Sequence, residues 1–128
     1  MSFKNLMIIK AVVCLAFGIL LLAVPDKLIS LFGATLNDGG MFTAREYGSS
    51  LLGNLFLCWF ARNAGESDAR KAIILALFVY DLIAFVMTTI TVISGILNLL
   101  GLAIVIIYLF FSLGFGYFLV QSPQTKVV

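Results

Sequence analysis

Apolar residues gather in long runs along this chain, and short polar connections separate the runs. A helix needs about 20 apolar residues to cross roughly 30 Å of hydrocarbon, and four runs have about that length. They predict membrane-spanning helices at about residues 6–24, 43–61, 71–93 and 98–120. We therefore expect an all-α fold: a polytopic membrane protein whose residues 1–128 form one domain, an antiparallel four-transmembrane-helix bundle.

The longest connection joins the first two predicted spans, and its first part interleaves apolar with polar residues. This pattern predicts a short interfacial helix at about residues 26–33. Pro25 suits the first turn of such a helix, and Gly33 suits its end. Residues 37–40, Asn-Asp-Gly-Gly, then predict a flexible turn. Two alternatives remain for this segment: a plain connector, or a lid over the outer mouth of the bundle.

Composition agrees with a membrane environment. The chain is 62% hydrophobic and 11% charged, whereas a soluble domain is usually about 45–50% apolar and about 25% charged. A soluble fold of this length could not hide so much apolar surface, so the bilayer is the expected solvent and partner. The net charge of +2 comes without a basic helix face, and nucleic acid is therefore not an expected partner.

Few residues in the chain carry cofactor chemistry. Histidine is absent, which argues against bis-histidine haem and most zinc sites. Cys14 and Cys58 lie in different predicted spans with no CxxC motif, so we interpret them as small apolar core residues. We expect no cofactor and no metal site.

The distribution of basic residues predicts the orientation. With four spans, both termini and the connection between spans two and three lie on one side, and the positive-inside rule makes that side cytoplasmic. The first run is long and no A-x-A-like cleavage site follows it, so we expect a retained helix rather than a signal peptide. The expected location is the plasma (inner) membrane of the cell. The basic residues on the cytoplasmic side are Lys4, Lys10, Arg62, Arg70, Lys71 and Lys126, against Lys27 and Arg45 outside.

Asp81 is the carboxylate that lies deepest in an apolar run. At 1.5 Å per residue it lies roughly 15 Å from the cytoplasmic edge of its span. Asn54 and Tyr108 lie at a similar depth in the second and fourth spans. If the three helices face one another, these side chains can form one hydrogen-bonded cluster near the middle of the bilayer.

Helical spacing predicts which face of each span points inward. Stripes of small and polar residues let membrane helices approach closely, and such stripes include Glu46, Thr88 with Asp81, and Asn98. Glu46 and Asn98 could line an outer vestibule. The alternative is that Glu46 only marks the membrane interface at a helix N-terminus. The predicted ligand or proton site comprises Asp81, Asn54, Tyr108, Glu46, Thr88 and Asn98.

An ionised Asp81 costs about 2.5–3.5 kcal/mol at the centre of a membrane helix. Lys10 and Arg45 are the candidate charge partners, but the depth count offsets each by about 10 Å, and both can snorkel outward to water. We therefore expect Asp81 to be protonated, with a direct salt bridge to Lys10 as the second alternative. Whether Asp81 serves a function or only holds helices together stays open.

Several positions match a pattern found in small membrane proteins. A first span ends in Pro25, Leu31-Phe32-Gly33 follow, and Arg45 and Gly48 lead into a glycine-rich second span. The first half of the chain thus resembles small uncharacterised four-helix integral membrane proteins, which implies a four-helix fold and no known activity. Small multidrug resistance transporters carry their acid in span one, where this chain has Lys10, and fluoride channels have an Arg-bearing first span that is missing here.

Three function classes follow from these features. The first is a non-enzymatic protein that binds a small apolar or amphipathic ligand, or a partner helix, at the inner face of the bundle. The alternative is an oligomeric proton-coupled transporter or channel in which Asp81 carries the proton. An enzyme is third, because no nucleophile or metal set is visible. A homo-oligomer or a partner membrane protein is compatible with each. The binding class predicts a pocket of roughly 300 Å³ or more that is enclosed within one bundle, rather than a solidly packed centre.

Overall fold

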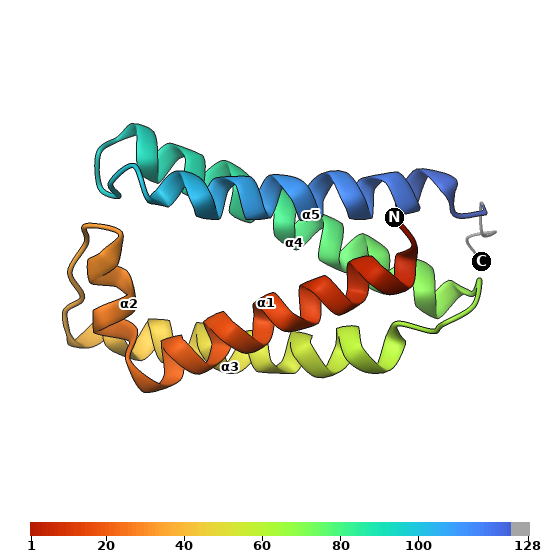
Figure 1. Ribbon diagram of the computed structural model, residues 1–128, viewed down its shortest axis with the longest axis horizontal. Coiled ribbons are helices and arrows are strands. Elements are labelled where there is room, and N and C mark those ends of the chain that lie inside the picture. The colour runs from red at the N-terminus through yellow and green to blue at the C-terminus, as the bar shows by residue number, and fades with distance from the viewer. Residues whose placement is uncertain (124–128) are drawn as a thin grey trace.

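The structure is a computed structural model that describes residues 1–123. Residues 124–128 lie outside the described part, and with them Lys126, one of the basic residues used to predict the orientation. The described chain contains no strand and folds into helices joined by short connections (Figure 1). The helices are α1 (Phe3–Ala23), α2 (Pro25–Leu31), α3 (Asp38–Ala61), α4 (Asp68–Ile93) and α5 (Gly101–Gln121).

The long helices form two antiparallel pairs, α1 with α3 and α4 with α5 (Figure 1). Glycine lets the first pair approach closely. A Cβ atom added at Gly48 would lie 3.0 Å from the carbonyl oxygen of Gly18, and one added at Gly18 would lie 2.9 Å from Leu52 Cδ2. This is the close backbone approach that small residues permit between membrane helices.

The two pairs pack against each other most closely at the end that carries the N-terminus, and they diverge toward α2 (Figure 1). In this view α1 runs obliquely to α3, and its N-terminal end lies nearer to α5. One apolar cluster fills the N-terminal end, and a second lies beneath α2. The first is built around Phe3, Leu6, Met7, Ile74, Phe111 and Phe115; the second consists of Cys14, Leu21, Leu28, Phe32 and Leu51.

Several helices begin at other residues than predicted, and two of these differences have a clear structural reason. Residues 37–40 are not a flexible turn, because the Asn37 side chain accepts a hydrogen bond of 2.7 Å from the Gly40 N–H and caps α3. α3 therefore begins at Asp38, before the predicted start at Thr43. An Asn cap satisfies a helix N-terminus that glycines alone would leave frayed. The last helix begins at Gly101 rather than at residue 98, because the preceding residues hold α2 in place, as described below.

Three helices within residues 1–123, α1, α4 and α5, are long and apolar enough to cross a membrane. α3 is as long, but Arg45, Glu46 and Asn54 dilute its apolar residues. Large apolar side chains point outward on several helices, including Phe60 at 76% exposed and Val120 at 86% exposed. The all-α prediction is confirmed, and the apolar helices support a membrane protein. The four-span bundle stays a prediction.

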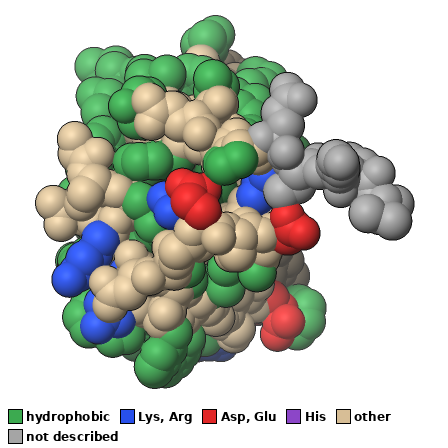
Figure 2. Space-filling model, turned by 90° about the vertical axis from the view of Figure 1, so that its right-hand side faces the viewer, with side chains coloured by type: hydrophobic (Ala, Val, Ile, Leu, Met, Phe, Trp, Pro, Cys, Tyr) green, Lys and Arg blue, Asp and Glu red, His purple; other side chains and the backbone are tan. Residues whose placement is uncertain are grey.

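Charged side chains gather at the end of the molecule where α1 begins and α3 connects to α4. Figure 2 looks onto this end and shows lysine, arginine and acidic side chains among polar atoms. Arg70 donates a hydrogen bond of 3.3 Å to Glu66, one turn earlier. The described charged residues of these segments are Lys4, Arg62, Glu66, Asp68, Arg70 and Lys71.

Candidate functional site

A buried ion pair links the two helix pairs. Lys10 on α1 donates a hydrogen bond to Asp81 Oδ1 on α4. Both residues are buried, Lys10 at 2% exposed and Asp81 at 0%. The ammonium group also lies 4.4 Å from the ring centre of Phe111 and 4.9 Å from that of Tyr80. Rings at these distances attract a cation through their negative faces, so the charge of Lys10 is met by a carboxylate and two aromatic rings.

The structure thus has the second of the two alternatives for Asp81, a direct contact with Lys10. The predicted offset of about 10 Å was wrong because the depth count treated the helices as parallel. α1 runs obliquely (Figure 1), and α4 begins at Asp68, one turn earlier than assumed. The apolar stem of a lysine can also lie along aromatic rings. The second carboxylate oxygen, Oδ2, has no hydrogen-bond partner within residues 1–123.

Three tyrosines form a second polar contact between the pairs. The Tyr47 hydroxyl on α3 is hydrogen-bonded to the hydroxyls of both Tyr80 on α4 and Tyr108 on α5. The Tyr80 and Tyr108 rings meet edge to face, with centres 6.2 Å apart. We call Tyr47, Tyr80 and Tyr108 the tyrosine trio. It joins α3 to the α4–α5 pair, as the ion pair joins α1 to α4.

Sequence reasoning found Tyr108 but missed Tyr47 and Tyr80. Two signals were present. Tyr80 directly precedes Asp81, the deepest acid of the chain. Tyr47 directly precedes Gly48, and a glycine inside a membrane helix often marks a close helix contact. Both tyrosines therefore lay beside positions that already pointed inward.

The inward face of α3 was assigned to the wrong side. Glu46, Ser49 and Ser50 are exposed, whereas Gly48 and Leu51 are buried. The serines need no neighbouring helix, because Ser49 donates to the Arg45 carbonyl at 3.1 Å and Ser50 to the Glu46 carbonyl at 3.3 Å. Hydroxyls that bond back to their own helix are stable on an outer face. Glu46 therefore lies on the outer face of α3 and does not line the cavity described below.

The predicted cluster of Asp81, Asn54 and Tyr108 does not form. Asn54 is half-buried, and within residues 1–123 its side chain makes no hydrogen bond to either of the other two. Asp81 bonds to Lys10, and Tyr108 bonds to Tyr47. The polar groups near the middle thus form two separate contacts rather than one.

Two further predicted residues lie away from these contacts. Thr88 is half-buried on α4, on the same face as Asp81 and two turns further along. Arg45, the other candidate cation, is exposed, and its Nε atom donates to the Leu22 carbonyl at 3.4 Å. Arg45 therefore contacts the end of α1 and is not a charge partner of Asp81.

Asn98 is hydrogen-bonded to the C-terminal end of α2. Its backbone N–H donates to the Phe32 carbonyl at 2.8 Å, and its side-chain Nδ2 donates to the Leu31 carbonyl at 3.0 Å. Its Oδ1 accepts from the Leu100 N–H at 3.0 Å. Gly33 follows α2 with a φ of +85° and packs against the Asn98 side chain. The connection between α4 and α5 thus holds α2 by its last carbonyl groups, which a helix end leaves without partners.

We expect Asn98→Ala to loosen α2 by about 1 kcal/mol, because one of the two side-chain hydrogen bonds that the variant loses is the bond to the Leu31 carbonyl at the end of α2. Hydrogen exchange in residues 25–33 would become several-fold faster. The matched control is Asn63→Ala, an exposed asparagine in the connection between α3 and α4, which should leave exchange in this segment unchanged. Equal exchange in both variants would show that Asn98 does not hold α2.

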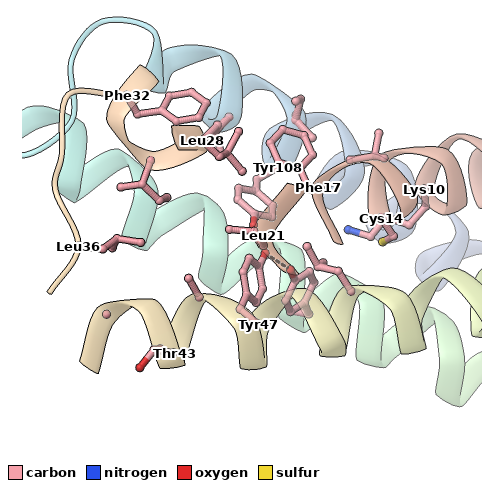
Figure 3. Close-up of a pocket in the computed structure, with 18 residues that line it drawn as sticks. Lys10, Cys14, Phe17, Leu21, Leu28, Phe32, Leu36, Thr43, Tyr47 and Tyr108 are labelled. Carbon is pink, nitrogen blue, oxygen red and sulfur yellow. Dashed lines mark hydrogen bonds between the residues drawn. The ribbon is translucent and has the colours of Figure 1, made fainter. Parts of the chain in front are cut away.

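A cavity of about 480 Å³ lies between the helix pairs, beneath α2. Figure 3 shows Lys10 at one end, Phe32 and Leu36 at the other, and Tyr47 and Tyr108 between them. α2 supplies part of the wall through Leu28 and Ile29, and Phe32, directly after the helix, adds to it. The remaining lining residues are Val13, Cys14, Phe17, Leu21, Gly40, Thr43, Ala44, Leu51, Tyr80, Ile104 and Ile107.

The walls of the cavity are almost entirely apolar; Tyr47 and Tyr108 lie near its middle and Lys10 at one end (Figure 3). Binding sites for small molecules commonly have this design, with apolar walls and a few well-placed polar groups in a volume of about 300–1,000 Å³. Within residues 1–123, no group of three His, Cys, Asp or Glu side chains is arranged to hold a metal ion. The arrangement is suited to binding an apolar molecule.

Comparisons with known proteins yield no match: no protein-family model, no curated protein and no solved structure is similar to this chain. The resemblance to small four-helix membrane proteins therefore stays a prediction.

Proposed function

We propose that the chain is an integral membrane protein of the plasma membrane. Its four spans would be the three apolar helices α1, α4 and α5 and, in addition, α3. Support comes from packing, since α3 lies antiparallel along α1 for much of its length (Figure 1). A helix of 24 residues is about 36 Å long, enough to cross the hydrocarbon layer. The basic residues at the end shown in Figure 2 support cytoplasmic termini.

We further propose that the protein binds a small apolar or amphipathic molecule between its two helix pairs and has no enzymatic role. The observation that carries this proposal is the cavity of about 480 Å³, which exceeds the roughly 300 Å³ expected of a binding site. A bundle that served only as a structural anchor would gain stability by filling this volume with side chains, because empty space costs packing energy.

The alternative of proton transport has less support. In that role Asp81 would take up and release a proton along a path, and it would need access to water. Asp81 is instead fully buried against Lys10. A buried ion pair can hold two helices together, because separating them would leave an uncompensated buried charge. We therefore assign the pair a structural role beside the cavity.

Photolabelling can test whether the cavity takes a ligand. The protein would be placed in lipid nanodiscs with a C12 alkyl diazirine, which inserts into whichever side chains it contacts. We expect labelled peptides to include the cavity walls, such as Leu28, Tyr47 and Ile107. Ala44→Phe, which adds a ring to the wall, should reduce this labelling several-fold.

The control for this experiment is Ala16→Phe. Ala16 is exposed on α1 and does not line the cavity, so this variant should label as the native protein does. Labelling confined to the outer faces of the helices, or unchanged in Ala44→Phe, would contradict a binding function.

A further inference from the structure

We infer that the cavity binds a single-chain fatty-acyl compound, a free acid or its ester, with the acyl oxygen at the Lys10 ammonium group and the hydrocarbon chain directed toward α2. The inference rests on the proposed binding function. It adds the class of ligand, the residue that recognises the head group and the direction in which the ligand lies. Lys10 would serve the ligand in addition to its bond with Asp81.

The tyrosine trio in the middle of the cavity has no donor left for a ligand. Tyr47 is hydrogen-bonded to Tyr80 and to Tyr108, and Tyr80 and Tyr108 are hydrogen-bonded to each other. Each tyrosine carries one O–H donor, so three bonds among three hydroxyls use all three protons. The trio therefore satisfies itself.

The polar groups at the α2 end of the cavity are also in use. Thr43 donates its hydroxyl to the Gly39 carbonyl at 2.9 Å, and the Gly40 N–H donates to the Asn37 side chain at 2.7 Å. Both bonds lie within the first turn and the cap of α3. Neither Thr43 nor Gly40 thus offers this donor to a ligand, and the head group of a ligand finds no partner in them.

The Lys10 ammonium group keeps N–H groups for which the described chain supplies no oxygen. It has three N–H groups, and within residues 1–123 it donates one hydrogen bond, to Asp81. The rings of Phe111 and Tyr80 attract the charge through their faces, but a charge-assisted hydrogen bond to an oxygen is a strong, directional contact that rings do not replace.

The Lys10 nitrogen is directed toward the middle of the cavity (Figure 3). An oxygen of a ligand placed there would accept one of the two remaining N–H groups. Because a buried N–H group without an acceptor is costly, this contact favours a ligand that carries an oxygen over one that is hydrocarbon throughout.

The charge that faces the cavity is positive. Lys10 is the only charged residue of the wall within residues 1–123, and Asp81, which balances it, does not line the cavity. An acyl oxygen, neutral in an ester and negative in a free acid, is attracted to this positive end of the pair. A cationic head group would meet a like charge in an apolar space without a carboxylate on the wall, so long-chain amines should bind weakly.

The order of residues along the cavity gives the direction of the ligand. Lys10 lies at one end, and Phe32 and Leu36 lie at the other (Figure 3). With its acyl oxygen at Lys10, a ligand extends its chain past the trio to apolar side chains such as Leu28. The reverse direction would bury the oxygen among these side chains and leave the Lys10 N–H groups without an acceptor.

Two photoreactive ligands test the direction. Both are twelve-carbon acyl chains with a diazirine, close to the acyl group in one and next to the chain end in the other, and each is used as the free acid and as the methyl ester in nanodiscs. We expect the first ligand to label α1 beside Lys10, at Cys14, and the second to label Leu28, Phe32 or Leu36. The reversed pattern, or identical labels from both ligands, would overturn the direction.

A matched series of head groups tests the class of ligand. The probes are dodecanoate, methyl dodecanoate, tridecane and dodecylammonium, and each would compete with the C12 alkyl diazirine at a known mole fraction in the bilayer. We expect the tighter of the two acyl probes to bind roughly tenfold or more tightly than tridecane, the gain of a hydrogen bond from a charged donor. Which of the two is tighter distinguishes a free acid from an ester. Dodecylammonium should bind no better than tridecane.

The double variant Lys10→Met with Asp81→Leu tests the role of Lys10. It replaces the ion pair by apolar side chains of similar size, an exchange that buried pairs often tolerate. In this variant the acyl probes should lose their advantage over tridecane, while tridecane still competes. Lys4→Met is the matched control, because Lys4 is exposed and does not line the cavity. If the double variant does not fold, the labelling pattern and the order of the four probes on the native protein decide.

The outcomes separate the inference from the function beneath it. If no probe displaces the diazirine from the cavity peptides, the proposed binding function itself fails. If tridecane or dodecylammonium binds as tightly as the acyl probes, the cavity binds ligands and the fatty-acyl class is wrong. An acyl advantage that persists in the double variant would overturn the role of Lys10.

Discussion

Asp81→Asn is expected to destabilise the protein by about 3–5 kcal/mol, the usual cost of removing one partner from a buried ion pair. The variant leaves the Lys10 ammonium group buried at 2% exposure without its carboxylate. The aromatic rings that remain beside it offset only about 0.5–2 kcal/mol. Unfolding by SDS in dodecylmaltoside micelles, followed by circular dichroism, would measure the loss.

Two comparisons make this prediction specific. The double variant Lys10→Met with Asp81→Leu removes both charges, and it should recover most of the lost stability because an apolar pair of similar size can replace a buried ion pair. Glu66→Gln breaks the more exposed Arg70 pair and should cost less than about 1 kcal/mol. If Asp81 instead carried a proton in transport, the result would differ. The Asp81→Asn variant would then fold as the native protein does but abolish proton-driven flux in liposomes.

Gly48→Leu is expected to have the second large effect, a loss of about 3 kcal/mol or more, at the upper end of what overpacking costs. A Cβ atom at this position would lie 3.0 Å from both the Gly18 carbonyl oxygen and Leu21 Cβ. The Gly18 carbonyl belongs to the backbone and cannot turn aside as a side chain can, so α1 and α3 would have to separate. Because Tyr47 is the neighbouring residue, the separation would also move the centre of the tyrosine trio.

The matched control for Gly48 is Gly53→Leu on the same helix. A Cβ atom at Gly53 would meet nothing within 4 Å, and replacing glycine inside a helix gains about 1 kcal/mol of helix propensity. Stability of the two variants would be compared in the same micelle titration, and the pair should differ by about 4 kcal/mol. Similar stabilities would show that the Gly18–Gly48 contact does not hold the helices together.

Much of the fold could be predicted from the order of apolar and polar residues. The long runs are helices, and the segment after Pro25 is a separate short helix. This helix spans Pro25–Leu31, against the predicted residues 26–33, and Gly33 follows it with a positive φ. The start of α3 could not be predicted well, since residues 37–40 are typical of a turn unless the Asn37 side chain caps the helix.

The site could be predicted only in part. Asp81 and Tyr108 were found because a polar group deep in an apolar run must find a partner. Their partners were not found. Lys10 lies at a different depth along a straight helix, and the tilt of α1 removes that difference (Figure 1). Glu46 was assigned inward because small and polar residues surround it, but serines that bond to their own helix are equally stable outside.

The sequence by itself determined the helices, the apolar solvent that suits them and the presence of an acid that needs a partner. These follow from local properties: the length of an apolar run, the turn residues and the cost of a buried charge. Only the tertiary structure decided which side chains meet. The Lys10–Asp81 contact, the tyrosine trio and the cavity all depend on helix rotation and tilt. A rotation by one residue, about 100°, moves a side chain from the core to the outer surface, and close packing at Gly18 and Gly48 selects one rotation for α1 against α3.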